Sequence, residues 1–130
     1  VITYIIDYLV RRRGLTLEET AHVLAASFWS TIADKGEEAK EQETLLRRMF
    51  PSLLVTGPFS IILGYTGGLM ALGDRLKLRS MVCAEKGDRA YISSEESAIR
   101  KIEPNLDRVW SPAGGEAVVF ELYGKGGLAR

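Results

Sequence analysis

Apolar residues recur at helical spacing along roughly the first fifty positions of the chain. An apolar residue follows every three or four positions from Ile2 to Leu9, which predicts a helix over residues 1–13. Basic residues fill its last turn and Gly14 follows, as at many helix ends. The chain therefore begins with an amphipathic helix.

Two more helices follow in the sequence. Thr16 has Glu19 three residues on, a capping-box pattern that begins a second helix. The apolar face of this helix continues to Asp34-Lys35-Gly36, which we expect to end it. Residues 37–49 are rich in Glu, Lys, Gln, Leu and Arg, so a third, largely exposed helix is expected, stopped by Phe50-Pro51.

After Pro51 short apolar segments alternate with turn sequences, a pattern typical of antiparallel strands. The run Ile61-Ile62-Leu63 does not alternate with polar residues, which indicates a strand covered on both faces. We expect these strands to form a meander. The expected strands are residues 59–64, 69–72, 79–85, 89–93 and 117–122.

One short helix interrupts the strands. Ser93 and Glu96 form a second capping-box pattern, which predicts a helix over residues 94–102 that ends before Pro104. The predicted fold class is α+β, with a helical layer over residues 1–50 and antiparallel strands over residues 51–130. Together they make one domain, or a large part of one.

Composition narrows the function classes. The chain has 130 residues, 46% of them hydrophobic, and 17 basic residues balance 17 acidic ones. With balanced charge, the chain has no net positive electrostatic field to attract nucleic acid. No apolar run approaches the roughly 20 residues that span a bilayer. The single cysteine, Cys83, fits a reducing cytoplasm. His22 has no metal-ligand pattern around it, so neither a metal site nor a cofactor is expected.

The segment richest in charged side chains with a candidate role links two expected strands. It contains Asp74, Arg75 and Arg79. Asp74 is placed to accept backbone N–H bonds in the turn, and an arginine to bond neighbouring carbonyls or Glu95. We expect Asp74-Arg75 to clamp this turn to the helix start at Ser94-Glu95, with Arg75 more buried than Arg79. The alternative is that the arginines line a passage or an interdomain surface.

These segments, in order, resemble the carboxyl-terminal part of a class-II glutamine amidotransferase domain. The similarity rests on residues 1–9, on Gly57-Pro58-Phe59 and the strand after it, on the Asp-Arg hairpin of residues 69–82, on Tyr91-Ile92-Ser93-Ser94-Glu95, and on Gly114-Gly115-Glu116. Ser80 and Gly114 depart from the family, which has proline at both places. The amino-acid sequence of residues 78–88 is most similar to that of the glutaminase domain of glutamate synthases.

The resemblance implies an amino-terminal-nucleophile hydrolase fold, a four-layer αββα sandwich, that hydrolyses glutamine and passes ammonia to a synthase domain or subunit. In that family an amino-terminal cysteine is the nucleophile, and its α-amino group is the base. The cysteine and the glutamine ligands would precede Val1, in an amino-terminal half of the domain. No catalytic or substrate-binding residue is therefore assigned to this chain.

Two further expectations follow. A sandwich cut in half would leave an apolar sheet face uncovered, which favours homo-oligomers. The alternative to a glutaminase portion is a non-catalytic regulatory or protein-interaction domain with the same α+β layering, in which Asp74, Arg75 and Glu95 are structural.

Overall fold

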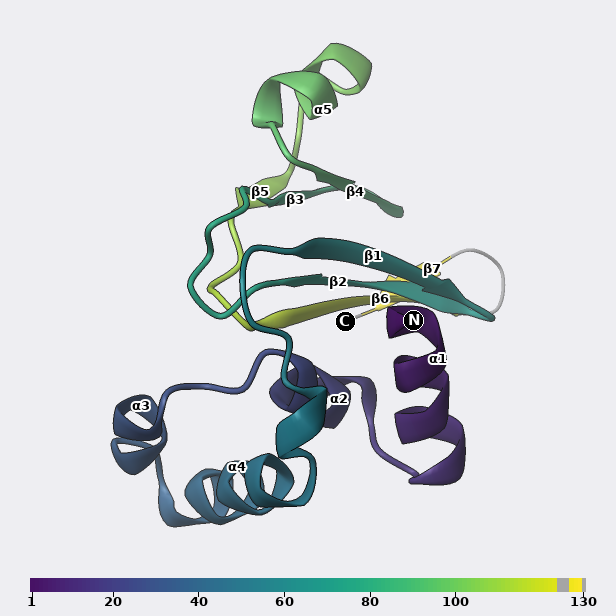
Figure 1. Ribbon diagram of the computed structural model, residues 1–130. Helices are drawn as coiled ribbons and strands as arrows, with labels where there is room; N and C mark the ends of the chain where they lie inside the picture. Colours follow the sequence, from purple (N-terminus) through teal and green to yellow (C-terminus); the bar gives the residue numbers. More distant parts are fainter. Residues whose placement is uncertain (124–126, 130) are drawn as a thin grey trace. The chain divides into compact units, whose positions relative to one another are not determined.

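The computed structural model describes the backbone of residues 1–123 and 127–129. The chain divides into two compact units, Val1–Gly57 and Pro58–Arg130. The first unit is helical, and the second contains the strands and one helix (Figure 1). The protein is therefore α+β, as the sequence predicts.

The helices of the first unit follow local signals closely. Gly14 ends the first helical stretch with a φ of +71°, and the Thr16–Glu19 capping box is present in both directions. The third predicted helix is confirmed at its predicted bounds. The elements of this unit are α1 (Ile2–Asp7), which continues as the π-helical η1 (Tyr8–Arg12), then α2 (Leu17–Leu24), α3 (Trp29–Ala33), α4 (Glu37–Met49) and the 3-10 turn η2 (Pro51–Leu53).

The prediction of a single second helix is wrong, because the helical backbone is interrupted between α2 and α3. The carbonyl of Leu24 accepts a hydrogen bond from the N–H of Val55 at 2.9 Å. The carbonyl of Ser27 accepts one from the guanidinium of Arg47. Both carbonyls are bonded to residues outside the helix, so the apolar stripe continues while the backbone does not remain helical.

The core of the first unit joins helices that are distant in sequence. Leu9, Val23, Leu46 and Phe50 form one buried cluster, which connects η1, α2 and the end of α4. Nothing in the described part of the chain is a helix long and apolar enough to cross a membrane.

The second unit contains two antiparallel sheets (Figure 1). One sheet has the order β1-β2-β6-β7 and the other has the order β4-β3-β5. Figure 1 shows helix α5 on the side of the three-stranded sheet that faces away from the four-stranded one. The elements are β1 (Ser60–Tyr65), β2 (Gly68–Gly73), β3 (Val82–Lys86), β4 (Arg89–Ser93), α5 (Glu96–Ile102), β5 (Arg108–Trp110), β6 (Ala117–Tyr123) and β7 (Gly127–Ala129).

The two sheets pack face to face through apolar side chains. Ala71 and Phe120 of the larger sheet share one cluster with Cys83 of the smaller sheet and with Met81 just before it. The ring of Trp110 lies 6.1 Å from that of Phe120, tilted by 57°. The second unit is thus a β-sandwich with a helix outside its smaller sheet.

The expected single meander is therefore wrong. β2 pairs with β6 and not with β3, and the segment between β2 and β3 carries the chain from one sheet to the other. β3 begins at Val82, three residues later than expected, because the residues before it belong to that connection.

The strand covered on both faces is β2 and not the run Ile61-Ile62-Leu63. The side chains of β1 alternate between exposed and half-buried, as in a strand covered on one face, and Ile62 is 58% exposed. In β2, by contrast, Met70, Ala71 and Leu72 are all fully buried.

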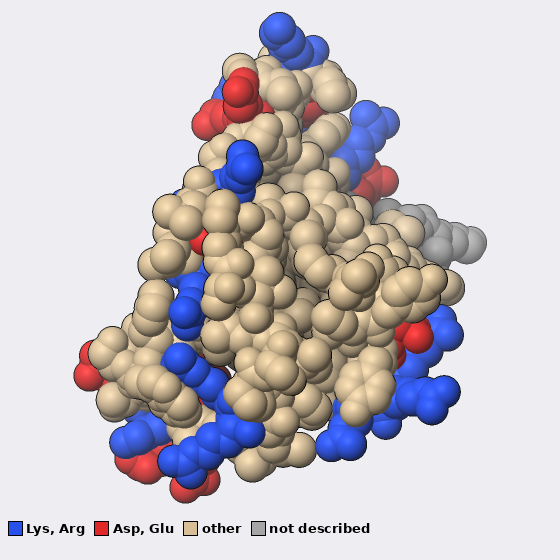
Figure 2. All heavy atoms as spheres, in the orientation of Figure 1, with Lys and Arg blue, Asp and Glu red and all other residues tan. Residues whose placement is uncertain are grey.

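The predicted capping box at Ser93 is also wrong. α5 begins at Glu96, two residues later than expected, and its N-cap Glu95 makes no side-chain capping bond. Ser93 Oγ instead accepts from the N–H of Glu95 at 3.3 Å. Figure 2 shows both acidic and basic side chains around α5. Glu96 and Arg100 of this helix form an ion pair at 2.6 Å.

Candidate functional site

The turn between the two sheets is organised by the carboxylate of Asp74. Its Oδ1 accepts hydrogen bonds from the N–H groups of Leu76 at 3.0 Å and Leu78 at 3.1 Å. Its Oδ2 accepts from the N–H groups of Phe59 at 3.3 Å and Arg79 at 3.4 Å. The expected role of Asp74 as acceptor of backbone N–H groups is confirmed.

The surroundings of Asp74 keep its carboxylate ionised. Its burial, at 2% exposure, raises the pKa of the carboxyl, but the backbone N–H groups of Leu78, Phe59, Arg79 and Leu76 together lower that pKa below its ordinary value. Because both oxygens are bonded to the chain's own backbone, this carboxylate suits a structural role better than proton transfer.

The expected clamp from Asp74-Arg75 to Ser94-Glu95 is not the arrangement observed. Glu95 and Ser94 are exposed, and the Glu95 carboxylate accepts from Ser97 Oγ at 3.4 Å, within its own helix start. Arg75 is half-buried and Arg79 exposed, in the expected order. The Asp74 carboxylate is instead bonded to backbone N–H groups of the crossing and of Phe59.

The Gly114-Gly115-Glu116 segment closes on itself just before β6. The Glu116 carboxylate accepts from the N–H of Ala113 at 2.7 Å, and the N–H of Glu116 donates to the Ala113 carbonyl at 3.1 Å. Gly115 has a φ of +73°, a conformation that favours glycine. These residues form a tight structural loop.

A cluster of charged side chains in the first unit was not predicted from the sequence. Glu43 on α4 has a side chain only 7% exposed, and its Oε1 is bonded to Lys35 Nζ. His22 Nδ1 of α2 lies 3.7 Å from the same oxygen. Lys35 Nζ also lies 3.5 Å from Ser27 Oγ. The cluster connects α2, α4 and the turn between α3 and α4.

The Glu43 cluster has a structural rather than a catalytic arrangement. A buried carboxylate is costly unless it is paired, and Lys35 supplies the pair. Glu43 Oε2 and Thr20 Oγ1 are buried without a hydrogen-bond partner, and in proteins such atoms usually bond ordered water. No helical periodicity or turn motif brings positions 22, 35 and 43 together, so only the structure could reveal the cluster.

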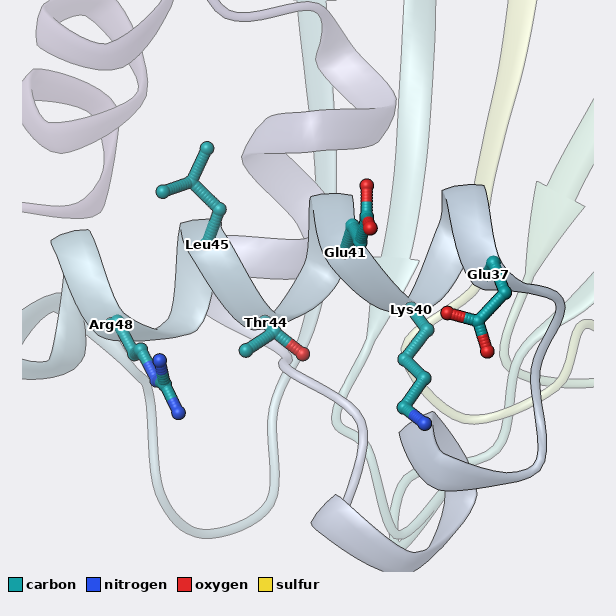
Figure 3. Close-up of a pocket in the computed structure, with 6 residues that line it drawn as sticks. All are labelled: Glu37, Lys40, Glu41, Thr44, Leu45 and Arg48. Atoms are coloured by element: carbon teal, nitrogen blue, oxygen red, sulfur yellow. The ribbon is translucent and has the colours of Figure 1, made fainter.

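Two surface hollows lie in the first unit. One, of about 370 Å³, is lined by side chains of α4 alone (Figure 3). A hollow of about 240 Å³ in the first unit includes Trp29, with the Arg47 guanidinium 4.2 Å from its ring centre. Ligand and active sites usually draw convergent groups from several elements, so the α4 groove is not a candidate active site. Its lining residues are Glu37, Lys40, Glu41, Thr44, Leu45 and Arg48.

The one cysteine of the chain is not placed to react. Cys83 is fully buried, and this burial, followed by the charges of Glu116 and Glu85, raises the pKa of its thiol to about 11. A nucleophilic cysteine needs the opposite shift, so Cys83 is a core thiol that does not suit catalysis. Among the described residues, no three His, Cys, Asp or Glu side chains are grouped to hold a metal ion.

Comparisons with known proteins find a relative that this chain matches over part of its length. A protein of Archaeoglobus fulgidus, described as an uncharacterized protein, is 40% identical over 122 residues, which cover 94% of this chain and 32% of the relative. The chain thus spans about a third of the length of the curated relative it matches. No family model matches the chain, and no solved structure matches it.

Proposed function

We propose that this chain is the carboxyl-terminal portion of a class-II glutamine amidotransferase domain of the glutamate synthase type. The whole domain would hydrolyse glutamine to glutamate and ammonia in the cytoplasm, and a partner synthase domain or subunit would accept the ammonia. An amino-terminal half of the domain would complete the site.

The observation that carries the proposal is the crossing between two stacked antiparallel sheets at Asp74. The Asp-Arg segment, residues 69–82, resembles that of the family, but here it joins β2 of one sheet to β3 of the other and does not form a hairpin. In such a domain, the two sheets and α5 outside the smaller one would form three of the four layers of an αββα sandwich. The stacked sheets with a helix outside them support the proposal, because the resemblance implies a layered αββα sandwich.

In the proposed sandwich, the fourth layer would be helical and would lie on the outer face of the four-stranded sheet. Ala71 packs into the sandwich, and side chains alternate along a strand, so Met70 and Leu72 lie on the other face of β2. Both are apolar, as expected for a strand with a layer on each side.

The reaction would be carried out by residues upstream of Val1. There an amino-terminal cysteine would attack the glutamine amide carbon, release ammonia and leave a thioester, which water hydrolyses to glutamate. Cys83 does not suit this role because its thiol is buried and has a raised pKa. The contribution of these 130 residues would be the sandwich core.

The full-length A. fulgidus relative provides the test. The purified relative should release ammonia from glutamine and should form a covalent adduct, seen by mass spectrometry, with the glutamine analogue 6-diazo-5-oxo-L-norleucine. Chain 1–130 is the control and should do neither. If the relative also fails in both assays, or if chain 1–130 alone releases ammonia, the proposal is wrong.

A further inference from the structure

The Leu76–Arg79 loop, residues 76 to 79 of the crossing, is held rigidly by its own backbone. Its N–H groups from Leu76, Leu78 and Arg79 donate to the Asp74 carboxylate. The N–H of Lys77 donates to the Asp74 carbonyl at 3.0 Å. Every N–H of the loop is therefore bonded to one buried residue, and a loop fixed in this way loses little conformational entropy when it binds.

This rigid loop exposes apolar side chains. Leu76 is 57% exposed and Leu78 is 59% exposed, although they are separated by a single residue. The backbone N–H groups of both leucines donate to the Asp74 carboxylate, and their side chains take no part in those bonds. Two leucines presented to solvent by a fixed backbone differ from the isolated exposed apolar residues that occur on most surfaces.

The exposed charged side chains of the loop are all basic. Lys77 and Arg79 are exposed, while the nearby carboxylate of Asp74 is buried and directed to backbone amides. Lys77 has a φ of +55°, a backbone conformation that costs a non-glycine residue free energy. The loop therefore presents two cations alternating with two leucines, on a chain whose net charge is zero.

We propose that the Leu76–Arg79 loop is a docking point for an acidic surface of a partner protein that has apolar side chains or a groove to receive Leu76 and Leu78. Charge complementarity identifies the sign of the partner, because opposite potentials across an interface steer association and suppress wrong partners. The leucines supply apolar area at the centre of the contact, and the cations lie beside them. This inference does not depend on glutamine hydrolysis and stands for a glutaminase portion or an interaction domain alike.

The test is a titration of ¹⁵N-labelled chain 1–130 with synthetic amphipathic peptides, followed by amide chemical shifts. The first peptide alternates paired glutamates and leucines. One control peptide has lysine in place of each glutamate, and the other has serine in place of each leucine. We expect shifts at residues 76–79 with the first peptide at about 1 mM or below, and at least tenfold weaker binding of both controls.

Two variants separate docking from folding. The double variant Leu76→Ser, Leu78→Ser keeps every backbone N–H that Asp74 accepts, and Lys77→Gly removes a charge at a φ that glycine adopts without strain. Both should fold, with unchanged shifts elsewhere, and both should bind the acidic peptide at least fivefold more weakly.

Three outcomes would overturn the proposal. The first is the absence of shifts at residues 76–79 with about 1 mM acidic peptide. The second is equal binding by wild type and by the double leucine variant. The third is binding to phosphatidylglycerol vesicles or to single-stranded DNA with no binding to the acidic peptide, which would assign the loop to a membrane or to nucleic acid.

Discussion

The backbone carbonyl of Arg75 occupies the place where a side chain on Gly114 would begin. A Cβ atom added to Gly114 would lie 2.4 Å from that oxygen and 2.8 Å from the carbonyl carbon. The loop before β6 thus passes directly against the Asp74 crossing, and only a residue without a side chain fits there. This contact accounts for the glycine at position 114.

Gly114→Ala should therefore destabilise the protein. The clash is with backbone rather than with a flexible side chain, so either the crossing or the loop must move. We expect the midpoint of thermal unfolding to fall by about 5 °C or more. Gly64→Ala is the matched control, since a Cβ there meets nothing within 4 Å, and it should leave the midpoint within about 2 °C. Equal shifts for the two variants would contradict the contact.

Elements with signals inside their own sequence were predictable. Helix α4 has its predicted bounds because Phe50-Pro51 ends it locally and Gly36 precedes it. The role of Asp74 was also predictable, since aspartate is a frequent acceptor of nearby backbone N–H groups in turns.

Features set by distant partners were not predictable. The break after Leu24 depends on Val55, thirty-one residues later, and on the side chain of Arg47. Strand β5 has only three residues, and its register with Cys83–Glu85 defines it. Periodicity reports which face of an element is apolar, but not which backbone will complete its hydrogen bonds.

Asp74 should make stability depend on pH. The pKa of its carboxyl is lowered in the folded protein from an ordinary value of 3.8. The stabilisation is therefore fully present above about pH 4 and is lost as the pH falls through the folded pKa. Asp74→Asn should lower the unfolding midpoint by several degrees at pH 7, and its difference from wild type should shrink below pH 4. Asp88→Asn, in the exposed β3–β4 turn, is the control and should show neither effect.

Cys83 should resist alkylation in the folded protein. Burial raises the pKa of its thiol to about 11, so at pH 8 roughly one thiol in a thousand is ionised, and the sulfur is also inaccessible. Iodoacetamide should label the native chain at least about a hundredfold more slowly than the chain in denaturant. Rapid labelling of native protein, measured by mass spectrometry, would show that the sandwich opens or that Cys83 is exposed.

The Lys35–Glu43 pair should matter far more than the exposed ion pair on α1. Lys35→Met leaves Glu43, whose side chain is 7% exposed, as a buried carboxylate without its lysine partner. A fully buried pair broken on one side costs about 3 to 5 kcal/mol. Because Lys35 is itself 30% exposed, we expect a loss of about 1 to 3 kcal/mol in the free energy of unfolding.

The matched control for this pair is Arg11→Met. Arg11 pairs with Asp7 at 2.9 Å, but the two side chains are 80% and 53% exposed, so its loss should cost under about 1 kcal/mol. The double variant Lys35→Met, Glu43→Gln should recover part of the stability, because it removes the uncompensated charge together with its partner. Urea unfolding of the four proteins gives these differences directly. If Lys35→Met cost no more than Arg11→Met, water would be screening Glu43, and the cluster would not be a buried link between α2 and α4.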